Sequence, residues 1–466
     1  ASGNVITGKI KKETQKAYFE FNGNMLDPMT GIVTTIPVSI KHSLQHEKLQ
    51  QAGQIFETSD FNTHDGPENP ELLIITSSIC SLYAKEAVDV MNLDSKVAIL
   101  KLGTTWPLPS KLIQKRIQKT RQILFVEEIQ PFVEENIKVL SAQWPDTLGQ
   151  KIFFGKHSNH IPMTGELNSN LVIKALELIF SIGHKSFSNS YKTLADKALE
   201  NCAPAREISF CPGCPHRASF FIINKVLQLD NHNGFTCGDI GCYSLGILPG
   251  GFSTIKTLHA MGSGTGVASG FGKLSQFGMD QPIISVCGDS TFFHSGMPPL
   301  VNAVHNESNL TMIILDNSGT AMTGFQPHPG LSIGTRGKPA PEVDIEKVCK
   351  AMGAATRICD PFDLEKAENI LLELMETKGV NVLILRQICT LSPEKKGKKY
   401  FHISIDKEKC KGEDCGCNRL CTRIFSCPGL IWNKEENKAM VNEIICTGCG
   451  FCTQICPVDA IKAEGL

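Results

Sequence analysis

The sequence lacks three features that would assign the protein to particular classes. It has no apolar stretch long enough to span a bilayer, and no charged-then-apolar N-terminus of the signal-peptide kind. It has no excess of one charge either, because 46 Lys and Arg stand against 47 Asp and Glu, for a net charge of −1. These absences predict a cytoplasmic protein without a membrane span and without electrostatic attraction to nucleic acid.

Cysteine, in contrast, is abundant. The chain has 19 cysteines, and nine of them fall between Cys410 and Cys456. A secreted disulfide framework and metal ligation in a reducing compartment are the two explanations. The odd count, the crowding and the missing export signal favour metal ligation in the cytoplasm.

The first part of the chain predicts an arm and an α/β domain. Residues 1–70 are polar and punctuated by glycine, with one expected helix at Ser39–Gln51, and we expect a connecting arm. Residues 71–185 alternate short apolar runs with helical stretches, which predicts a mostly parallel sheet covered by helices. The expected strands are Leu72–Thr76, Val97–Leu102 and Gln122–Val126.

The second part predicts another α/β domain and a cysteine-rich module, each after a linker. Ser186–Ser190 is the first linker, and a glycine-rich α/β domain is expected at residues 205–391. The lysine-rich segment Ser392–Lys399 is interpreted as a solvated linker, with a docking patch for an acidic partner as the alternative. The cysteine-rich module is expected at residues 403–466.

The last cysteine run has the spacing C-x2-C-x2-C-x3-C-P. This is the spacing of bacterial two-cluster ferredoxins, in which the fourth cysteine binds the other cluster. A zinc site is the alternative, and it is disfavoured because zinc cysteines usually come as two separated C-x2-C pairs. A segment of roughly 60 residues can hardly build an apolar core, which independently favours inorganic clusters. The run consists of Cys446, Cys449, Cys452 and Cys456.

The preceding cysteine run is irregular and has one cysteine too many. It consists of Cys410, Cys415, Cys417, Cys421 and Cys427. By analogy with the crossed ferredoxin pattern, we expect Cys427 to join Cys446, Cys449 and Cys452, and Cys456 to complete the other [4Fe–4S] cluster. Which of the first three cysteines bind iron stays open.

Two expected strands of the glycine-rich domain end in polar turns. Ile283–Cys287 leads into Gly288-Asp289-Ser290, and Leu310–Leu315 leads into a turn containing Asn317 and Gly319. A helix at Pro298–His305 lies between them, so both turns should meet at the carboxyl edge of one parallel sheet, where α/β folds bind ligands. Gly288 and the following helix start suit a phosphate, while Asp289, Asn317 and a carbonyl near Gly319 suit Mg²⁺.

Asn317 follows Asp289 by 28 residues, which resembles the thiamin diphosphate (ThDP) signature. An ordinary tight turn is the alternative. A second glycine-rich turn, Met261–Gly266, is expected where the backbone passes close to a cofactor. Four scattered cysteines suggest a third cluster nearby, although zinc or redox ligation by the first two is an equally open interpretation. They are Cys211, Cys214, Cys242 and Cys389.

Long motifs resemble the large (alpha) subunit of indolepyruvate:ferredoxin oxidoreductase, in the 2-oxoacid:ferredoxin oxidoreductase superfamily. The resemblance covers roughly residues 70–466. The motifs are Cys211–Arg217, Gly238–Tyr243, Gly288–Gly296, Leu315–Gly330, Lys101–Pro109, Val126–Glu128 and the ferredoxin-like tail.

The resemblance implies two doubly wound parallel-sheet domains, one transketolase C-terminal-like and one binding the ThDP diphosphate, plus a small α+β ferredoxin domain with two [4Fe–4S] clusters. It implies oxidative decarboxylation of an arylpyruvate-type 2-oxoacid to acyl-CoA and CO2, with coenzyme A as co-substrate and electrons passing to ferredoxin.

The resemblance also implies roles for single residues. Cys211, Cys214, Cys242 and Cys389 would hold the [4Fe–4S] cluster nearest ThDP. His216 and His294 are expected as active-site polar groups, with structural histidines as the alternative. The expected cofactor-binding residues are Gly241, Cys242, Gly262, Gly264, Gly288, Asp289, Ser290, Asn317 and Thr320.

The family's subunit normally starts with a further domain, which binds the aminopyrimidine of ThDP and which we do not find in this sequence. We expect that domain on another polypeptide, or removed, and we expect a gamma/beta-type subunit as a second partner. Two alternatives remain open. One is an electron-transfer or assembly subunit with a non-functional ThDP site, and the other is a ThDP oxidoreductase that uses a different 2-oxoacid or no coenzyme A.

Overall fold

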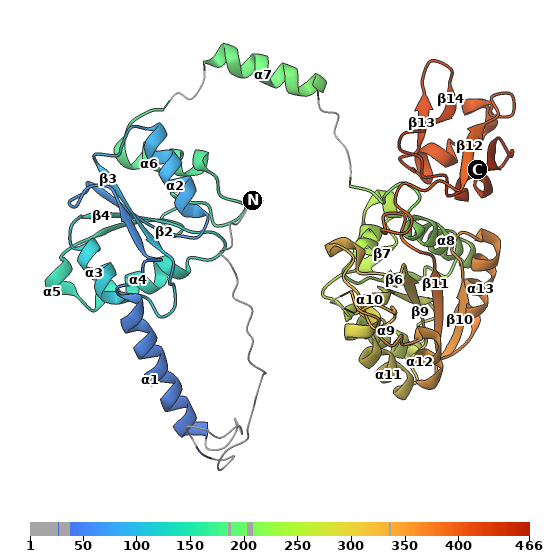
Figure 1. Cartoon of the computed structure of the whole chain (residues 1–466), viewed down its shortest axis with the longest axis horizontal. Helices are drawn as coiled ribbons and strands as arrows, with labels where there is room; N and C mark the ends of the chain where they lie inside the picture. Colours follow the sequence, from blue (N-terminus) through green and yellow to red (C-terminus); the bar gives the residue numbers. More distant parts are fainter. Residues whose placement is uncertain (1–26, 28–37, 185–187, 203–207, 335–336) are drawn as a thin grey trace. The chain divides into compact units, whose positions relative to one another are not determined.

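The computed structural model describes residue 27 and residues 38–184, 188–202, 208–334 and 337–466. The chain divides into two compact units, Ala1–Cys202 and Ala203–Leu466 (Figure 1). The second α/β sheet and the cysteine-rich module thus belong to the same unit. The boundaries of the four segments expected from the sequence stay predictions.

A five-stranded sheet forms the centre of the first unit, in the order β1-β3-β2-β4-β5. Its middle strands are fully or almost fully buried, as a sheet covered on both faces requires. The pairs β2–β3, β2–β4 and β4–β5 are parallel, and β1 pairs antiparallel with β3. The strands are β1 (Thr63–Asp65), β2 (Leu72–Ser77), β3 (Val97–Leu102), β4 (Gln122–Val126) and β5 (Ile152–Phe154).

Helices cover both faces of this sheet, as expected. Leu72 and Ile74 of β2 pack in the core beneath α2 (Cys80–Val90) and α6 (Ser169–Phe180). Leu73 and Ile75 point to the opposite core, beneath α3 (Ser110–Ile117) and α4 (Phe132–Ala142), because strand side chains alternate between faces. Figure 1 shows the two helix pairs on opposite sides of the strands.

The arm expected at residues 1–70 is described only at residue 27 and from residue 38 onward. The expected helix is confirmed as α1 (Val38–Phe56), which has no buried residue. Residues 63–65 differ from the expectation, because they form β1 at the edge of the sheet. Three polar residues are too few to give a strand signal in the sequence. The short helix α5 (Pro145–Leu148) and the exposed helix α7 (Asn189–Cys202) complete this unit.

The second unit contains a six-stranded, entirely parallel sheet in the order β10-β11-β9-β8-β6-β7. The expected strands at residues 283–287 and 310–315 are confirmed as β8 and β9. The strands are β6 (Phe235–Cys237), β7 (Ile255–Thr257), β8 (Ile283–Gly288), β9 (Leu310–Asp316), β10 (Ala355–Cys359) and β11 (Val380–Arg386).

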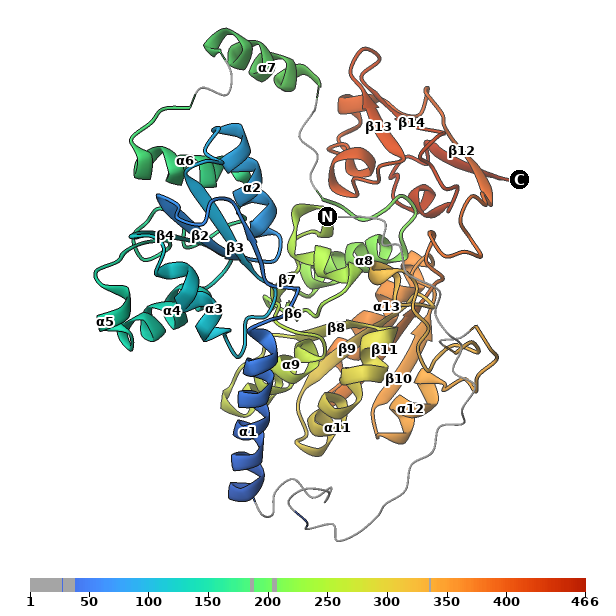
Figure 2. The same cartoon turned by 60° about the vertical axis from the view of Figure 1, so that its left-hand side comes forward.

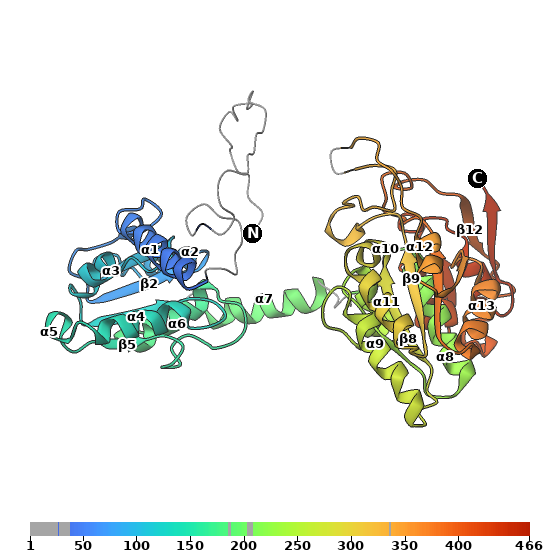
Figure 3. The same ribbon diagram turned by 90° about the horizontal axis from the view of Figure 1, so that it is seen from below.

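This sheet also has a core on each face. The helices α8 (Pro215–Asp230) and α13 (Leu364–Glu376) cover one face. The other face is covered by α9 (Ser263–Lys273), α11 (Met297–His305) and α12 (Ile345–Ala351). Figures 2 and 3 show β8 and β9 between the two helix layers. The expected doubly wound α/β fold is confirmed.

The strand order reverses between β6 and β8. From β6 the chain moves outward to β7, and from β8 it moves to β9 on the opposite side. The loops that leave β6 and β8 therefore diverge and open a crevice at the carboxyl edge, which is where open α/β sheets bind ligands. The one-turn helix α10 (Asp289–Thr291) and the π-helical turn η4 (Phe292–Gly296) follow β8 at this point.

The cysteine-rich module consists of two small antiparallel ladders. One joins β12 (Phe401–Ile405) to β15 (Ile461–Gly465), beside the C-terminus in Figure 3, and the other joins β13 (Leu430–Asn433) to β14 (Lys438–Val441). Three short helical turns carry one cysteine each, and the other six lie in the loops beside them: η6 (Gly412–Cys415), η7 (Leu420–Ile424) and η8 (Phe451–Gln454).

Aromatic packing holds this module to the sheet. The rings of Phe425 and Phe451 lie 5.7 and 6.4 Å from the ring of Phe221 on α8. The Gln454 side chain donates to the Phe362 carbonyl and accepts from the Leu364 amide, at 2.6 and 3.0 Å.

No helix in the described ranges is long and apolar enough to cross a bilayer.

Candidate functional site

A cavity of about 100 Å³ opens at the point where the strand order reverses. Most of the site residues expected from the sequence line it. They are His216, Gly241, Cys242, Gly288, Asp289, Ser290, Asn317, Gly319 and Thr320. His294 does not line the cavity; it is exposed on η4.

Asp289 links the two polar turns of this edge. Its Oδ1 accepts a hydrogen bond from its neighbour Ser290 N at 2.7 Å, and its Oδ2 accepts from Gly319 N at 3.1 Å. Asp289 is 2% exposed. A carboxylate, an amide oxygen from Asn317 and a backbone carbonyl make a hard-oxygen donor set, which fits Mg²⁺. No group of three His, Cys, Asp or Glu side chains in the described residues is placed to bind a single metal ion, and the Mg²⁺ set needs only one carboxylate.

His216 contacts the side chain of Asn317. The His216 Nε2 and Asn317 Nδ2 atoms are 3.4 Å apart, and both residues are buried. Burial lowers the pKa of His216 to about 4, so the ring is neutral near pH 7 and its Nε2 can accept from the amide. The amide oxygen of Asn317 is then not needed for this contact, and it would be available as a ligand if Mg²⁺ occupied the cavity.

The second glycine-rich turn is placed differently from the expectation. The buried carboxylate of Asp239 accepts hydrogen bonds from the amides of Gly262 and Gly264, at 2.7 and 3.3 Å. Burial raises the pKa of Asp239. These two amides are therefore occupied within the protein, and neither glycine lines the cavity, although Met261 does. The turn shapes a wall of the site without offering these N–H groups to a phosphate.

Close backbone approach explains two glycines that do line the cavity. A Cβ atom at Gly288 would lie 2.7 Å from Cε1 of Tyr243, and one at Gly241 would meet the same ring atom. The Tyr243 hydroxyl donates to the Ile240 carbonyl at 2.9 Å and lies 2.8 Å from Thr291 Oγ1. Only glycine leaves room for this ring between the loops after β6 and β8.

The four scattered cysteines come together beside the cavity. Cys242 lines it directly, and the Cys389 amide donates to the Asn317 carbonyl at 3.1 Å. Burial, together with the neighbouring groups of Cys211 and Cys389, raises the pKa of Cys214 to about 12 and that of Cys242 to about 11. Thiolates buried this closely need a positive partner, and iron in a cluster is such a partner.

The cysteines of the tail line two further cavities, and their assignment to clusters stays a prediction. The first group surrounds a cavity that Cys214 also borders, and it consists of Cys427, Cys446, Cys449 and Cys452. The second surrounds another cavity and consists of Cys410, Cys415, Cys417, Cys421 and Cys456. The 18 cysteines whose side chains the structure describes are all free thiols. Amides of Gly448 and Ala460 donate to Cys446 and Cys456 sulfur, at 3.4 and 3.3 Å, as is common around clusters.

Known protein families match the two parts of this site. Residues 239–385 match the thiamine pyrophosphate enzyme, C-terminal TPP binding domain, and residues 439–462 match the 4Fe-4S binding domain. The chain is 34% identical to indolepyruvate oxidoreductase subunit IorA of Pyrococcus abyssi and 33% identical to that of Thermococcus kodakarensis. Both alignments cover 99% of this chain and 71% of the relative. The chain belongs to the indolepyruvate oxidoreductase subunit IorA family.

The tail of this IorA family member has a relative of its own. It is 36% identical to a ferredoxin of Methanothermococcus thermolithotrophicus, over 13% of this chain and 97% of that protein. The chain is therefore a subunit of a ThDP-dependent 2-oxoacid:ferredoxin oxidoreductase, with a thiamine pyrophosphate-binding domain and an iron–sulfur, ferredoxin-like domain.

The structure adds residues that sequence reasoning did not single out in this IorA family member. His328 Nε2 lies 3.1 Å from Asp289 Oδ2, and the His328 ring stacks on Phe293 at 5.6 Å. Tyr243 and Asp239 organise the loops around the cavity, as described above. All three residues fall inside or beside the quoted motifs. The sequence has no short spacing pattern that identifies these three residues, because the groups they contact follow other strands of the sheet.

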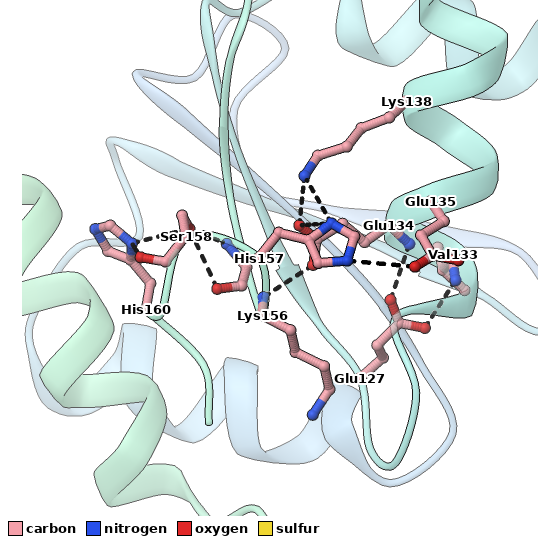
Figure 4. Close-up of polar contacts among 10 residues, drawn as sticks. Glu127, Val133, Glu134, Glu135, Lys138, Lys156, His157, Ser158 and His160 are labelled. Carbon is pink, nitrogen blue, oxygen red and sulfur yellow. Dashed lines mark hydrogen bonds and ion pairs between the residues drawn. The ribbon is translucent and has the colours of Figure 1, made fainter. Parts of the chain in front are cut away.

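The carboxyl edge of the first sheet is organised differently (Figure 4). Glu127 directly follows β4, and its two oxygens accept hydrogen bonds from the amides of Val133 and Glu134, both at 2.8 Å. Burial raises the pKa of Glu127. Glu134 is fully buried, and it accepts from Lys138 Nζ at 2.6 Å and from Lys156 N at 2.8 Å. These carboxylates are satisfied by their own unit.

Proposed function

We propose that this chain contributes the diphosphate half of a ThDP site and a three-cluster electron relay to an arylpyruvate-type 2-oxoacid:ferredoxin oxidoreductase. The proposed reaction converts a 2-oxoacid and coenzyme A to acyl-CoA, CO2 and a proton, and two electrons leave one at a time to ferredoxin. When bound, ThDP supplies the electron sink for decarboxylation.

The observation that carries the proposal is the succession of cysteine groups from the cavity outward. Cys242 belongs to the wall of the diphosphate cavity, and Cys214 borders the cavity of the next group. A Cβ atom added at Gly213 would collide with Thr447 Oγ1, so the loop of Cys211 and Cys214 touches the loop of Cys446 and Cys449. This succession supports electron transfer from the cofactor to the tail.

The chain's own residues divide the work of the site. Asp289, Asn317 and the Gly319 region would hold Mg²⁺, and Gly288 leaves space for a diphosphate oxygen. Neutral His216 fixes the Asn317 amide. His328, pressed against Asp289, would hold the carboxylate toward the metal.

We propose three [4Fe–4S] clusters with the ligand groups described above. The five-cysteine group has one thiol to spare among Cys410, Cys415 and Cys417. A partner subunit would provide the aminopyrimidine-binding domain, and a gamma/beta-type subunit would complete the complex. Ferredoxin would be the electron acceptor.

Measuring ThDP, Mg²⁺ and iron in the purified complex tests the proposal. Three four-iron clusters require about twelve iron atoms per chain. A value of about eight would contradict the cluster proposed for the group that contains Cys211 and Cys389. Absence of both ThDP and Mg²⁺ would favour the electron-transfer or assembly subunit instead.

A substrate screen tests the reaction. Aryl and alkyl 2-oxoacids are offered with ferredoxin reduction as the readout, with and without coenzyme A. We expect aryl 2-oxoacids and a requirement for coenzyme A. Ferredoxin reduction without coenzyme A, or by alkyl 2-oxoacids alone, would contradict the proposed reaction.

A further inference from the structure

One guanidinium group is buried between two of the cysteine groups. Arg217 is the third residue of α8 and is 1% exposed. It borders the same cavity as Cys214 on one side and Cys427, Cys446, Cys449 and Cys452 on the other. An arginine in this position carries a full positive charge, because its pKa is too high for it to lose its proton in a protein.

Neutral groups make all of the hydrogen bonds to this cation. Its Nη1 donates to the carbonyls of Phe425 and Ser426, each at 2.9 Å, and its Nη2 donates to the Phe210 carbonyl. The guanidinium carbon also lies 5.7 and 5.8 Å from the ring centroids of Phe210 and Phe425. The Nε–H group is buried and has no hydrogen-bond partner in the described part of the chain.

Burying such a charge without an anion is costly. Burial lowers the pKa of Arg217, and the groups that raise it are the thiols of Cys427, Cys214 and Cys211. No carboxylate of the described residues is among them. The anions that compensate Arg217 are therefore the cysteine groups themselves, and its orphaned Nε–H is a donor suited to a cluster or cysteine sulfur.

We propose that Arg217 is a positioning residue of the electron relay, a fixed cation that raises the reduction potential of the clusters on both sides of it. The inference rests on the proposed iron–sulfur assignments. Each cluster gains a negative charge when it is reduced, and a nearby cation stabilises that form more than the oxidised one. Net charge and hydrogen bonds to sulfur are among the factors that set cluster potentials.

A purely structural role is the competing explanation. Arg217 ties Phe210, which precedes α8, to Phe425 and Ser426 in the cysteine-rich module, so it also clamps two segments together. Loss of the clamp would reduce stability or iron content. It would not shift the potential of clusters that remain bound, so a redox titration distinguishes the two roles.

The test uses the assembled complex and an EPR-monitored redox titration, with iron content measured for each protein. Arg217→Gln removes the charge but retains N–H donors for the carbonyls. At a fixed potential we expect the ratio of reduced to oxidised cluster to fall about tenfold. For a one-electron couple this corresponds to a potential that is lower by ~59 mV. Arg217→Lys retains the charge, so at about pH 6 we expect no more than about a threefold change.

Lys225→Met is the matched control. Lys225 is on the same helix, and its ammonium pairs with Glu368 at 2.7 Å, away from the cysteines. Removing this charge should leave the potentials of all clusters unchanged. A shift as large as that of Arg217→Gln would show that any lost charge has the same effect, which would overturn the proposal.

The remaining outcomes also decide. Wild-type potentials in Arg217→Gln, at wild-type iron content, would overturn the role of Arg217 and leave the proposed function intact. If Arg217→Gln loses iron, Arg217→Lys decides: a tenfold loss of reduced cluster at about pH 6, with iron retained, would refute the charge effect. A wild-type complex without iron would instead refute the proposed function.

Discussion

The two α/β sheets of this chain share an architecture and differ in what stands at their carboxyl edges. Each is doubly wound, and each has an acidic residue directly after a central strand. In the first sheet, both carboxylate oxygens of Glu127 accept hydrogen bonds from amides at the start of α4. In the second, Asp289 bonds to its own neighbour and to Gly319 on the next loop, beside an open cavity.

The difference shows how one edge becomes structural and the other functional. Glu127 caps a helix start six residues further along the chain, so its charge serves the fold. Asp289 begins a helix of only one turn, and its carboxylate connects loops from two adjacent strands. Connecting the loops at the point of strand reversal holds the walls of the crevice in place. At the first edge Glu127 also lines a cavity, of about 330 Å³, but both of its oxygens are already bonded to the start of α4.

The largest effect is expected from Asp289→Ala. Loss of the carboxylate removes a Mg²⁺ ligand and the bond to Gly319 N, and we expect about a thousandfold lower ferredoxin reduction. The tail clusters should keep their EPR signals and iron. Glu127→Ala, in the first sheet, is the comparison variant and should not lower ThDP content. Unchanged turnover in Asp289→Ala would contradict the metal assignment.

The next effect is expected from Glu134→Ala in the first sheet. The substitution leaves the Lys156 amide without its acceptor and opens space in a fully buried network, so we expect a loss of about 3 kcal/mol in unfolding free energy. Denaturant unfolding followed on the first unit measures this. Glu134→Gln, which keeps an acceptor for the Lys156 amide, should lose less. Equal losses in the two variants would speak against the hydrogen bond as the cause.

Ligand addition should stabilise only one of the two sheets. At a hundredfold excess over Kd, ThDP with Mg²⁺ should add about 2.7 kcal/mol to the second unit. Hydrogen exchange resolved by segment measures both units in one experiment, and EDTA should reverse the effect. Protection of the first sheet by the same amount would contradict the distinction between a carboxylate that caps a helix and one that lies at a ligand site.

The smallest effect is expected from Gly288→Ala. The new Cβ would lie 2.7 Å from the Tyr243 ring, and shifting that ring should weaken ThDP binding by about tenfold, or roughly 1.4 kcal/mol. Gly266→Ala is the control, because its Cβ meets no atom within 4 Å. A second substitution, Tyr243→Ala, should relieve the clash. Titration of ThDP into each variant provides the measurement.

Sequence reasoning identified central strands of both large sheets, because fully buried parallel strands are continuous apolar runs, and it did not identify the short strands β5, β6, β7 and β10. The strands expected at residues 97–102 and 122–126 match β3 and β4 to the residue. It did not identify β1 or α7, which have three polar residues and an almost entirely exposed surface, respectively. Without a buried face, neither produces a periodic pattern.

The site was predictable where local chemistry defines it and unpredictable where distant contacts do. Gly-Asp at a strand end and the cysteine spacings mark their positions in the sequence directly. Arg217 does not, because its acceptor at Phe425 is 208 residues away. In the same way, Asp239 can accept hydrogen bonds from the amides of Gly262 and Gly264 only when the folded sheet brings them together.

The exchange of Cys427 and Cys456 between the two tail groups has a consequence for the lifetime of the module in air. With iron bound as proposed, each metal site is closed by a residue from the chain segment that surrounds the other. Oxidative release of iron at one site would leave its cysteines without bound iron. The chain segment that also surrounds the other site would then lose one of its points of attachment. If the clusters are bound as proposed, we therefore expect the two sites to lose iron together, at the rate of the more vulnerable one.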